Sequence, residues 1–332
     1  MKTLAFFNNK GGVGKTSLVY HLSWMLTEQG LNVLAVDLDP QANLTAMFLD
    51  ESRLEKLWPD GDHPETIYGA LQPILEGTGD VSLSKLEAIT NHLYLIPGDL
   101  GLSHFEDRLS DAWPRCHDGD IAAFRTITAF YRLAAEGGAR TKADIILIDV
   151  GPNLGAINRS ALIASDQVVI PLGADLYSLQ GLKNIGPALR EWRKGWKERL
   201  SKKPKDLNVP KGLMDPIGYV VSQHGILESR PVKAYQKWLE RIPSIYREYV
   251  LSRDIKNPPR PDKDKYALAL LKHYRSLMPL AMAARKPMFA LKVADGAIGA
   301  HVEAVAKCGK DFGELARKIT ENANIQLNPD IS

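Results

Sequence analysis

The chain has 332 residues, 45% of them hydrophobic and 24% charged, which is ordinary for a globular protein with a substantial core. Two cysteines are too few for a disulfide framework, and no run of about 18 apolar residues exists, so we expect a cytoplasmic protein without a membrane-spanning helix. The net charge of +3 hides an asymmetry: residues 1–150 hold 12 Lys and Arg against 21 Asp and Glu, whereas residues 151–332 hold 30 against 18.

Short apolar runs alternate with helical patterns along the chain. Residues 4–7 predict a strand that ends at a glycine loop, and residues 16–29 carry apolar side chains at helical spacing. Gly30 ends this helix, and residues 33–36 predict a second buried strand. Further short apolar runs lie at residues 145–148, 168–170 and 217–221. The alternation predicts an α/β fold with a doubly wound, mostly parallel sheet covered on both faces.

Two stretches interrupt this pattern. Residues 50–90 are acidic and rich in turn residues, and we expect them to form a surface excursion. Residues 193–275 are basic and punctuated by prolines, and they predict a helical insertion. Neither stretch looks able to fold alone, so we expect a single domain over residues 1–332.

Residues 8–17, NNKGGVGKTS, come close to a phosphate-binding loop between a strand and a helix. The standard pattern requires glycine where the chain has Asn9, and Lys10 is an additional lysine. The glycines would let backbone N–H groups surround phosphate oxygens at the positive end of the helix. We expect Lys15 to contact the terminal phosphates and the Thr16 hydroxyl to bind Mg²⁺.

Three aspartates follow apolar runs. Asp37 and Asp39 are two residues apart, so both can face the crevice at the carboxyl edge of the sheet, one near magnesium and one near a water. Asp149 ends another apolar run, as the magnesium-side acid of a nucleotide hydrolase does. Gly151 offers a flexible joint where a terminal phosphate would be sensed.

These motifs resemble the deviant Walker ATPases of the ParA, Soj and MinD type. The resemblance rests on KGGVGKTS, VDLDPQAN, ILIDVGPNLGAINRSALIASDQVVIPLGADLYSLQGL and the late KPMFALKVADGAIGAHVEAVAKCGKDFGELARKI. It covers about residues 1–48, 143–192 and 286–320. It implies a P-loop ATPase that uses ATP and Mg²⁺ and works as a homodimer with the nucleotide sandwiched between its subunits.

The resemblance also assigns roles to individual residues. It implies that Lys10 reaches the partner subunit's ATP, that Asp39 positions the attacking water, and that Lys10, Lys15 and Asp39 are the catalytic residues. Thr16, Asp37 and Asp149 would hold magnesium. The predicted ATP contacts are Lys10, Gly11, Gly12, Val13, Gly14, Lys15, Thr16 and Ser17, with Ser222 and Gln223 as adenine-side candidates.

Basic residues recur at helical spacing in the second half of the chain. One stripe consists of Arg190, Arg193, Lys194 and Lys197, and a second of Arg230, Lys233, Lys237 and Arg241. Such stripes fit binding to the phosphate backbone of DNA without base readout. A charged helix face is also commonly only solvated, and that alternative stays open.

Resemblance and charge together predict an ATP-driven positioning switch. We expect a dimer that binds nonspecific DNA, associates with the nucleoid when ATP-bound, and has a weak ATPase stimulated by a ParB-like adaptor protein. The cargo would be a plasmid, a chromosome or a large protein body. The alternative is the ATPase subunit of a defence or regulatory assembly, with DNA binding incidental. The polar C-terminal sequence ENANIQLNPDIS predicts no membrane partner.

Overall fold

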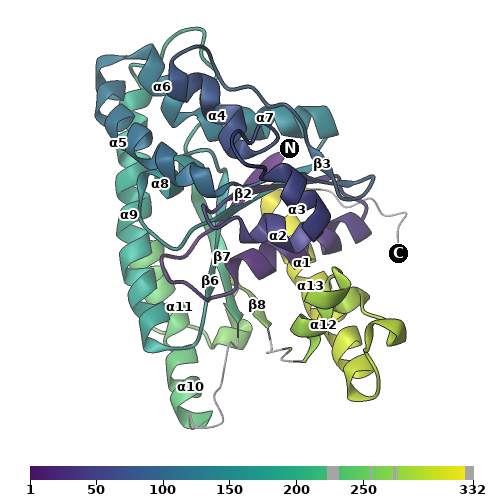
Figure 1. The fold of residues 1–332 in the computed structure, drawn as a ribbon. Helices are drawn as coiled ribbons and strands as arrows, with labels where there is room; N and C mark the ends of the chain where they lie inside the picture. Colours follow the sequence, from purple (N-terminus) through teal and green to yellow (C-terminus); the bar gives the residue numbers. More distant parts are fainter. Residues whose placement is uncertain (223–231, 255, 272–273, 275, 326–332) are drawn as a thin grey trace.

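A central β-sheet organises the fold in the computed structural model, which describes residues 1–222, 232–254, 256–271, 274 and 276–325 (Figure 1). Within these residues, the strands are β1 (Lys2–Phe6), β2 (Val33–Leu38), β3 (Glu87–Ala88), β4 (Leu93–Ile96), β5 (Ile145–Val150), β6 (Gln167–Leu172), β7 (Asp215–Ser222) and β8 (Ala267–Leu271). Their order is β3-β4-β2-β5-β1-β6-β7-β8, and all neighbours are parallel except β3 and β4. The predicted doubly wound α/β fold is therefore confirmed.

Helices connect these strands and cover the sheet. They are α1 (Lys15–Glu28), α2 (Asn43–Phe48), α3 (Glu51–Leu57), α4 (Ile67–Glu76), α5 (Phe105–Arg115), α6 (Ile121–Ile127), α7 (Ala129–Thr141), α8 (Ala156–Ile163), α9 (Leu176–Leu200), α10 (Val232–Leu239), α11 (Ile242–Ile245), α12 (Leu277–Ala284) and α13 (Ala300–Ala323). A π-helical turn, η3 (Tyr246–Val250), continues α11. In the part of the chain that the structure describes, no helix is both long and apolar enough to cross a membrane.

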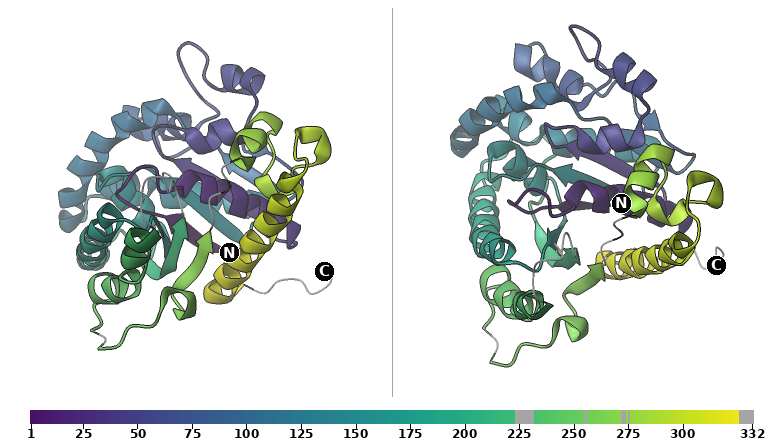
Figure 2. Two further views of the ribbon diagram at one scale, coloured as in Figure 1. Left: turned by 90° about the horizontal axis from the view of Figure 1, so that it is seen from below. Right: turned by 60° about the horizontal axis from the view of Figure 1, so that its bottom comes forward.

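Helices lie on both faces of the sheet (Figure 2), and the described residues form a hydrophobic core on each face. Side chains alternate along each strand, so Leu4 and Phe6 of β1 pack with α1, α2, α12 and α13. Ala5 and the following Phe7 pack with the helices of the other face, including α5, α8 and α9. Because strands such as β5 are buried at every residue, they read as continuous apolar runs in the sequence.

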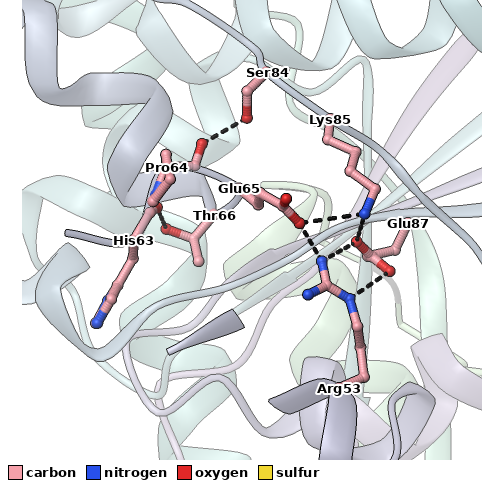
Figure 3. Close-up of polar contacts among 8 residues, drawn as sticks. All are labelled: Arg53, His63, Pro64, Glu65, Thr66, Ser84, Lys85 and Glu87. Carbon is pink, nitrogen blue, oxygen red and sulfur yellow. Dashed lines mark hydrogen bonds and ion pairs between the residues drawn. The ribbon is translucent and has the colours of Figure 1, made fainter. Parts of the chain in front are cut away.

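Residues 50–90 do more than project from the surface. They include α3, α4 and β3, and Ile67 and Leu71 of α4 are fully buried in the core. Ion pairs join the parts of this segment, with Arg53 bonded to Glu65 and Glu87 and with Lys85 close to both carboxylates (Figure 3). The segment is therefore anchored to the sheet edge.

Residues 193–275 differ from the expected helical insertion. The stretch contains β7, which the apolar run at 217–221 predicts, and also β8, which the sequence did not reveal. Both strands extend the central sheet, and β8 pairs with β7 in parallel. The basic stretch is therefore partly built into the fold.

Candidate functional site

The glycine loop between β1 and α1 has backbone angles that suit glycine. Gly12 has a φ of 71° and Gly14, which precedes the first residue of α1, has a φ of 85°. These positive values are strained for residues with a side chain. The loop therefore presents the N-terminus of α1, with its unpaired N–H groups, to the carboxyl edge of the sheet.

Lys15 lies at the base of this loop and is largely buried. Its side chain is 6% exposed, and its Nζ donates to the Lys10 carbonyl at 3.4 Å. Burial lowers the pKa of Lys15, while the charges of Asp149 and Asp39 oppose this shift. A phosphate in the loop would supply the anion that a buried ammonium group requires.

Asp37 and Asp149 are neighbours at the ends of adjacent strands, because the register of β2 and β5 pairs them directly. Both side chains are fully buried. Burial raises the pKa of Asp37 to about 7, although hydrogen bonds from Thr45 lower it in part. Burial and the nearby Asp37 carboxyl raise the pKa of Asp149 well above its ordinary value. Two such acids together favour a cation beside them.

The donor set fits Mg²⁺. The Thr16 side chain lies close enough to Asp149 to lower its pKa in part, but neither Asp149 oxygen accepts a hydrogen bond from any described residue. Across the described ranges, no group of three or more His, Cys, Asp or Glu is arranged to hold a metal. Magnesium commonly takes one or two carboxylates and completes its shell with water and phosphate oxygens. The free Asp149 oxygens therefore suit a magnesium ion that arrives with a nucleotide.

Thr45 positions Asp37, and the sequence did not reveal this residue. Its backbone N–H and hydroxyl donate to Asp37 Oδ2 at 2.9 and 2.7 Å. The Gly98 N–H in turn donates to the Thr45 hydroxyl at 2.7 Å, and a Cβ at Gly98 would lie 2.7 Å from Asp37 Cγ. The only sequence signal is a threonine in the helix that follows the aspartates, which is too common to have identified it.

Asp39 lies just beyond β2 and is 7% exposed. Its Oδ1 accepts from the Gln41 N–H at 3.1 Å. A Cβ at Gly151 would lie 3.3 Å from the same oxygen, so glycine allows the chain after β5 to pass close to Asp39. The structure thus brings Asp39 and Gly151 together, as their positions after neighbouring strands suggest.

Lys10 is held by α9. Its Nζ lies 2.8 Å from Asp175 Oδ2 and 5.8 Å from the centre of the Tyr177 ring. Asp175 also caps α9 by accepting from the Ser178 N–H at 2.9 Å. Sequence reasoning did not identify Asp175, which is 165 residues from Lys10. The second lysine of the loop therefore has a carboxylate partner within its own subunit.

A cavity of about 610 Å³ extends from the loop between α1, α2 and α12. Of the predicted ATP contacts, Gly11, Gly12, Gly14, Lys15, Thr16 and Ser17 line it, whereas Lys10 and Val13 do not. Asp39 also lines it, together with residues that the sequence did not reveal: Tyr20, His21, Met47, Met278, Met282, Arg285 and Lys286. The volume and the mixture of polar and apolar walls suit a small-molecule ligand.

Of the two adenine-side candidates, the structure describes only Ser222. Ser222 ends β7 and is buried, but it is not among the described residues that line the cavity. Gln223 lies outside the described residues.

The residues of the first basic stripe fall into two groups in the structure. Arg190 donates to the Tyr249 carbonyl, and Arg193 donates to the carbonyls of Leu213 and Met214, so these two arginines stabilise the protein's own backbone. Lys194 and Lys197 are exposed on α9.

The second stripe is described only in part. Lys237 and Arg241 are exposed, and their charged groups lie 5.5 and 5.4 Å from the centre of the Trp238 ring. Arg230 lies outside the described residues, as does the side chain of Lys233.

Comparison with known proteins gives a consistent result. Residues 1–202 match a family model described as an AAA domain. Protein IncC of Escherichia coli is 32% identical over 185 residues, which cover 56% of this chain and 44% of IncC. The sporulation initiation inhibitor protein Soj of Bacillus subtilis is 32% identical over 184 residues, or 55% of this chain and 63% of Soj. The chain thus aligns with less than two thirds of either relative.

A solved structure shares the fold over almost the whole chain. The complex of Cyanothece McdA with ATP has a TM-score of 0.60 and 17% identity, and the match covers 98% of this chain and 97% of McdA. At this identity the similarity concerns the fold alone.

Proposed function

The chain belongs to the ParA-like P-loop ATPases, and we propose that it hydrolyses ATP as a switch that positions a cargo. The observation that carries this proposal is the group formed by Lys15, Asp37, Asp39 and Asp149 at the mouth of the glycine loop. The buried ammonium group of Lys15 suits the phosphates of a nucleotide. The buried carboxyl groups beside it suit the metal that accompanies the phosphates.

Each residue of this group has a distinct role in the proposed reaction. The loop amides and Lys15 bind the terminal phosphates and stabilise the charge that develops on them during transfer. Thr16, Asp37 and Asp149 would hold magnesium, which would neutralise phosphate charge. Asp39 lies at the cavity wall beside Gly151, where it orients the attacking water. Because Asp39 is the one carboxylate that orients this water, the intrinsic ATPase activity is weak.

Dimerisation supplies a further charge. In the proposed dimer, Lys10 leaves Asp175 and contacts the phosphates bound to the partner subunit, in the manner of an arginine finger. The half-buried position of Lys10 supports this proposal, since its ammonium group lies within reach of solvent and hence of a partner. Exchange of one anionic partner for another makes the dimer dependent on ATP.

Nonspecific DNA is the proposed surface along which the dimer is placed. The exposed cations Lys194, Lys197, Lys237 and Arg241 support this, as does the excess of basic residues after residue 150. Their phosphate contacts would be sequence-blind and strongly salt-dependent. The ATP-bound dimer would then associate with the nucleoid until a ParB-like adaptor stimulates hydrolysis and releases it.

A gel shift with a random-sequence duplex tests this function. At low salt, the wild-type protein should retard the duplex with ATP but not with ADP or without nucleotide. The matched variant Lys15→Ala removes the phosphate contact and should lose the ATP-dependent retardation. Absence of retardation in every nucleotide state would contradict DNA binding and favour the ATPase subunit of a regulatory or defence assembly.

A further inference from the structure

Helices α5, α8 and α9 lie next to one another (Figure 1). Residues of these three helices line a second cavity, away from the glycine loop. Its volume is about 290 Å³. Its lining residues are Trp113 from α5, Arg159 from α8, and Glu191, Trp192, Lys194, Gly195, Glu198 and Arg199 from α9. None of them belongs to the nucleotide site, and only Lys194 belongs to the basic stripes.

Two arginines meet at one indole ring in this cavity. The guanidinium carbon of Arg199 lies 3.7 Å from the centre of the Trp113 ring, and that of Arg159 lies 4.4 Å from the same point. Arg199 is only 5% exposed, and its Nε and Nη1 donate to the carbonyls of Trp113 and Gly195 at 2.7 and 2.8 Å. Backbone contacts and the indole face therefore fix its guanidinium group in place.

Arg159 keeps unused hydrogen-bonding capacity. Its Nε is buried and has no partner among the described residues, and its Nη2 makes one long contact of 3.5 Å to the Leu109 carbonyl. Burial and the adjacent Arg199 lower the pKa of Arg159 to about 10. Guanidinium groups that are partly desolvated and close together require an anion to offset their repulsion.

The described residues supply no such anion at close range. Within the described ranges, neither Arg159 nor Arg199 forms an ion pair with a carboxylate. Glu106 is the carboxylate that raises the pKa of Arg159 most, but its oxygens accept hydrogen bonds from the N–H groups of Ala156 and Ile157. Glu191 and Glu198 line the cavity, but both are exposed, so water screens their charges.

We propose that this cavity is a phosphate-binding site in which Arg159 and Arg199, fixed against Trp113, hold the anion and Lys194 contacts it from the rim. Arginine presents several N–H groups in one plane, which suits the oxygens of a phosphate group. The phosphate is either a free monoester or inorganic ion, or a diester in the backbone of DNA. The same arginines would serve both.

Binding of inorganic phosphate at constant ionic strength, measured by calorimetry, tests the site. The protein carries Lys15→Ala, because the glycine loop also takes phosphate. Arg159→Gln in this background should weaken phosphate binding about tenfold or more, the effect of removing a hydrogen bond to a charged group. Arg108→Gln is the matched control: it removes an exposed arginine of the same helix as Trp113, and it should leave binding unchanged.

Two outcomes would overturn the proposal: absence of phosphate binding to the Lys15→Ala protein, or equal binding by the Arg159→Gln and control variants. Thermal unfolding of each variant shows whether it is folded. A second arm compares random-sequence duplex binding by wild type and Arg159→Gln alone. Weaker DNA binding by Arg159→Gln assigns the phosphate to the DNA backbone, and unchanged binding assigns it to a free phosphate. The calorimetric result does not depend on ATPase activity.

Discussion

Asp175→Asn should strengthen ATP-dependent dimerisation, because in the free subunit Asp175 holds the lysine that the dimer uses. Burial disfavours the charged form of Asp175, but hydrogen bonds from Lys10 and the Ser178 amide outweigh this effect and hold its pKa below the ordinary value. Asparagine removes the charge and keeps an oxygen that can accept from the Ser178 N–H, so the N-cap of α9 is preserved. The substitution therefore frees Lys10 with little effect on the helix.

The size of the effect follows from the exposure of the ion pair. The side chains of Lys10 and Asp175 are 33% and 20% exposed, so the pair belongs at the upper end of the range for exposed pairs, about 1 kcal/mol. A symmetric dimer breaks two such pairs. Their loss in the free subunit should favour the dimer by about 2 kcal/mol, which corresponds to a roughly 30-fold lower Kd.

Sedimentation velocity with a non-hydrolysable ATP analogue measures this Kd. The matched control is Asp50→Asn, since Asp50 also caps a helix by accepting from a backbone N–H but has no ion pair with a lysine among the described residues. The control should leave the dimer Kd unchanged. An equal or higher Kd for Asp175→Asn would refute the reasoning and show that Asp175 does not compete with the partner's nucleotide for Lys10.

Three other predictions concern the nucleotide site and the basic surface. Lys10→Ala should abolish ATP-dependent dimerisation while ATP still binds, and a normal dimer by light scattering would contradict the proposed role in the partner subunit. Thr45→Val removes a hydroxyl that donates to Asp37, so the pKa of Asp37 should rise above about 7. Because magnesium binding needs the Asp37 carboxylate, the ATPase activity of the wild type at limiting Mg²⁺ should fall as the pH falls below 7. In the variant the midpoint of this fall should lie about one pH unit higher. An unchanged pH profile would argue against this role of Thr45. The double variant Lys194→Glu and Lys197→Glu should lower the slope of log affinity against log salt for duplex DNA by about 2, one phosphate contact for each lysine, whereas an unchanged slope would exclude both lysines from the DNA surface.

The sequence alone was enough to predict five strands of the sheet and the position of the glycine loop. Strands buried on both faces give continuous apolar runs, so β1, β2, β5, β6 and β7 were all visible as patterns. The loop was visible because its glycines and lysines follow one another directly in the chain. The resemblance to the ParA-type ATPases implied one magnesium site for Asp37 and Asp149, and these residues do meet, because parallel strands end at a common edge. These features depend on local periodicity and on a general rule of sheet topology.

The contacts that give individual side chains their partners depended on tertiary packing. Thr45 reaches Asp37 only because α2 folds back over the end of β2, and Asp175 reaches Lys10 across 165 residues of chain. The basic stripe on α9 reads as one exposed face in the sequence, yet the packing of α9 directs Arg190 and Arg193 to backbone carbonyls and leaves Lys194 and Lys197 in solvent. Helical spacing fixes which residues share a face, but only the neighbouring elements decide whether that face meets protein or water.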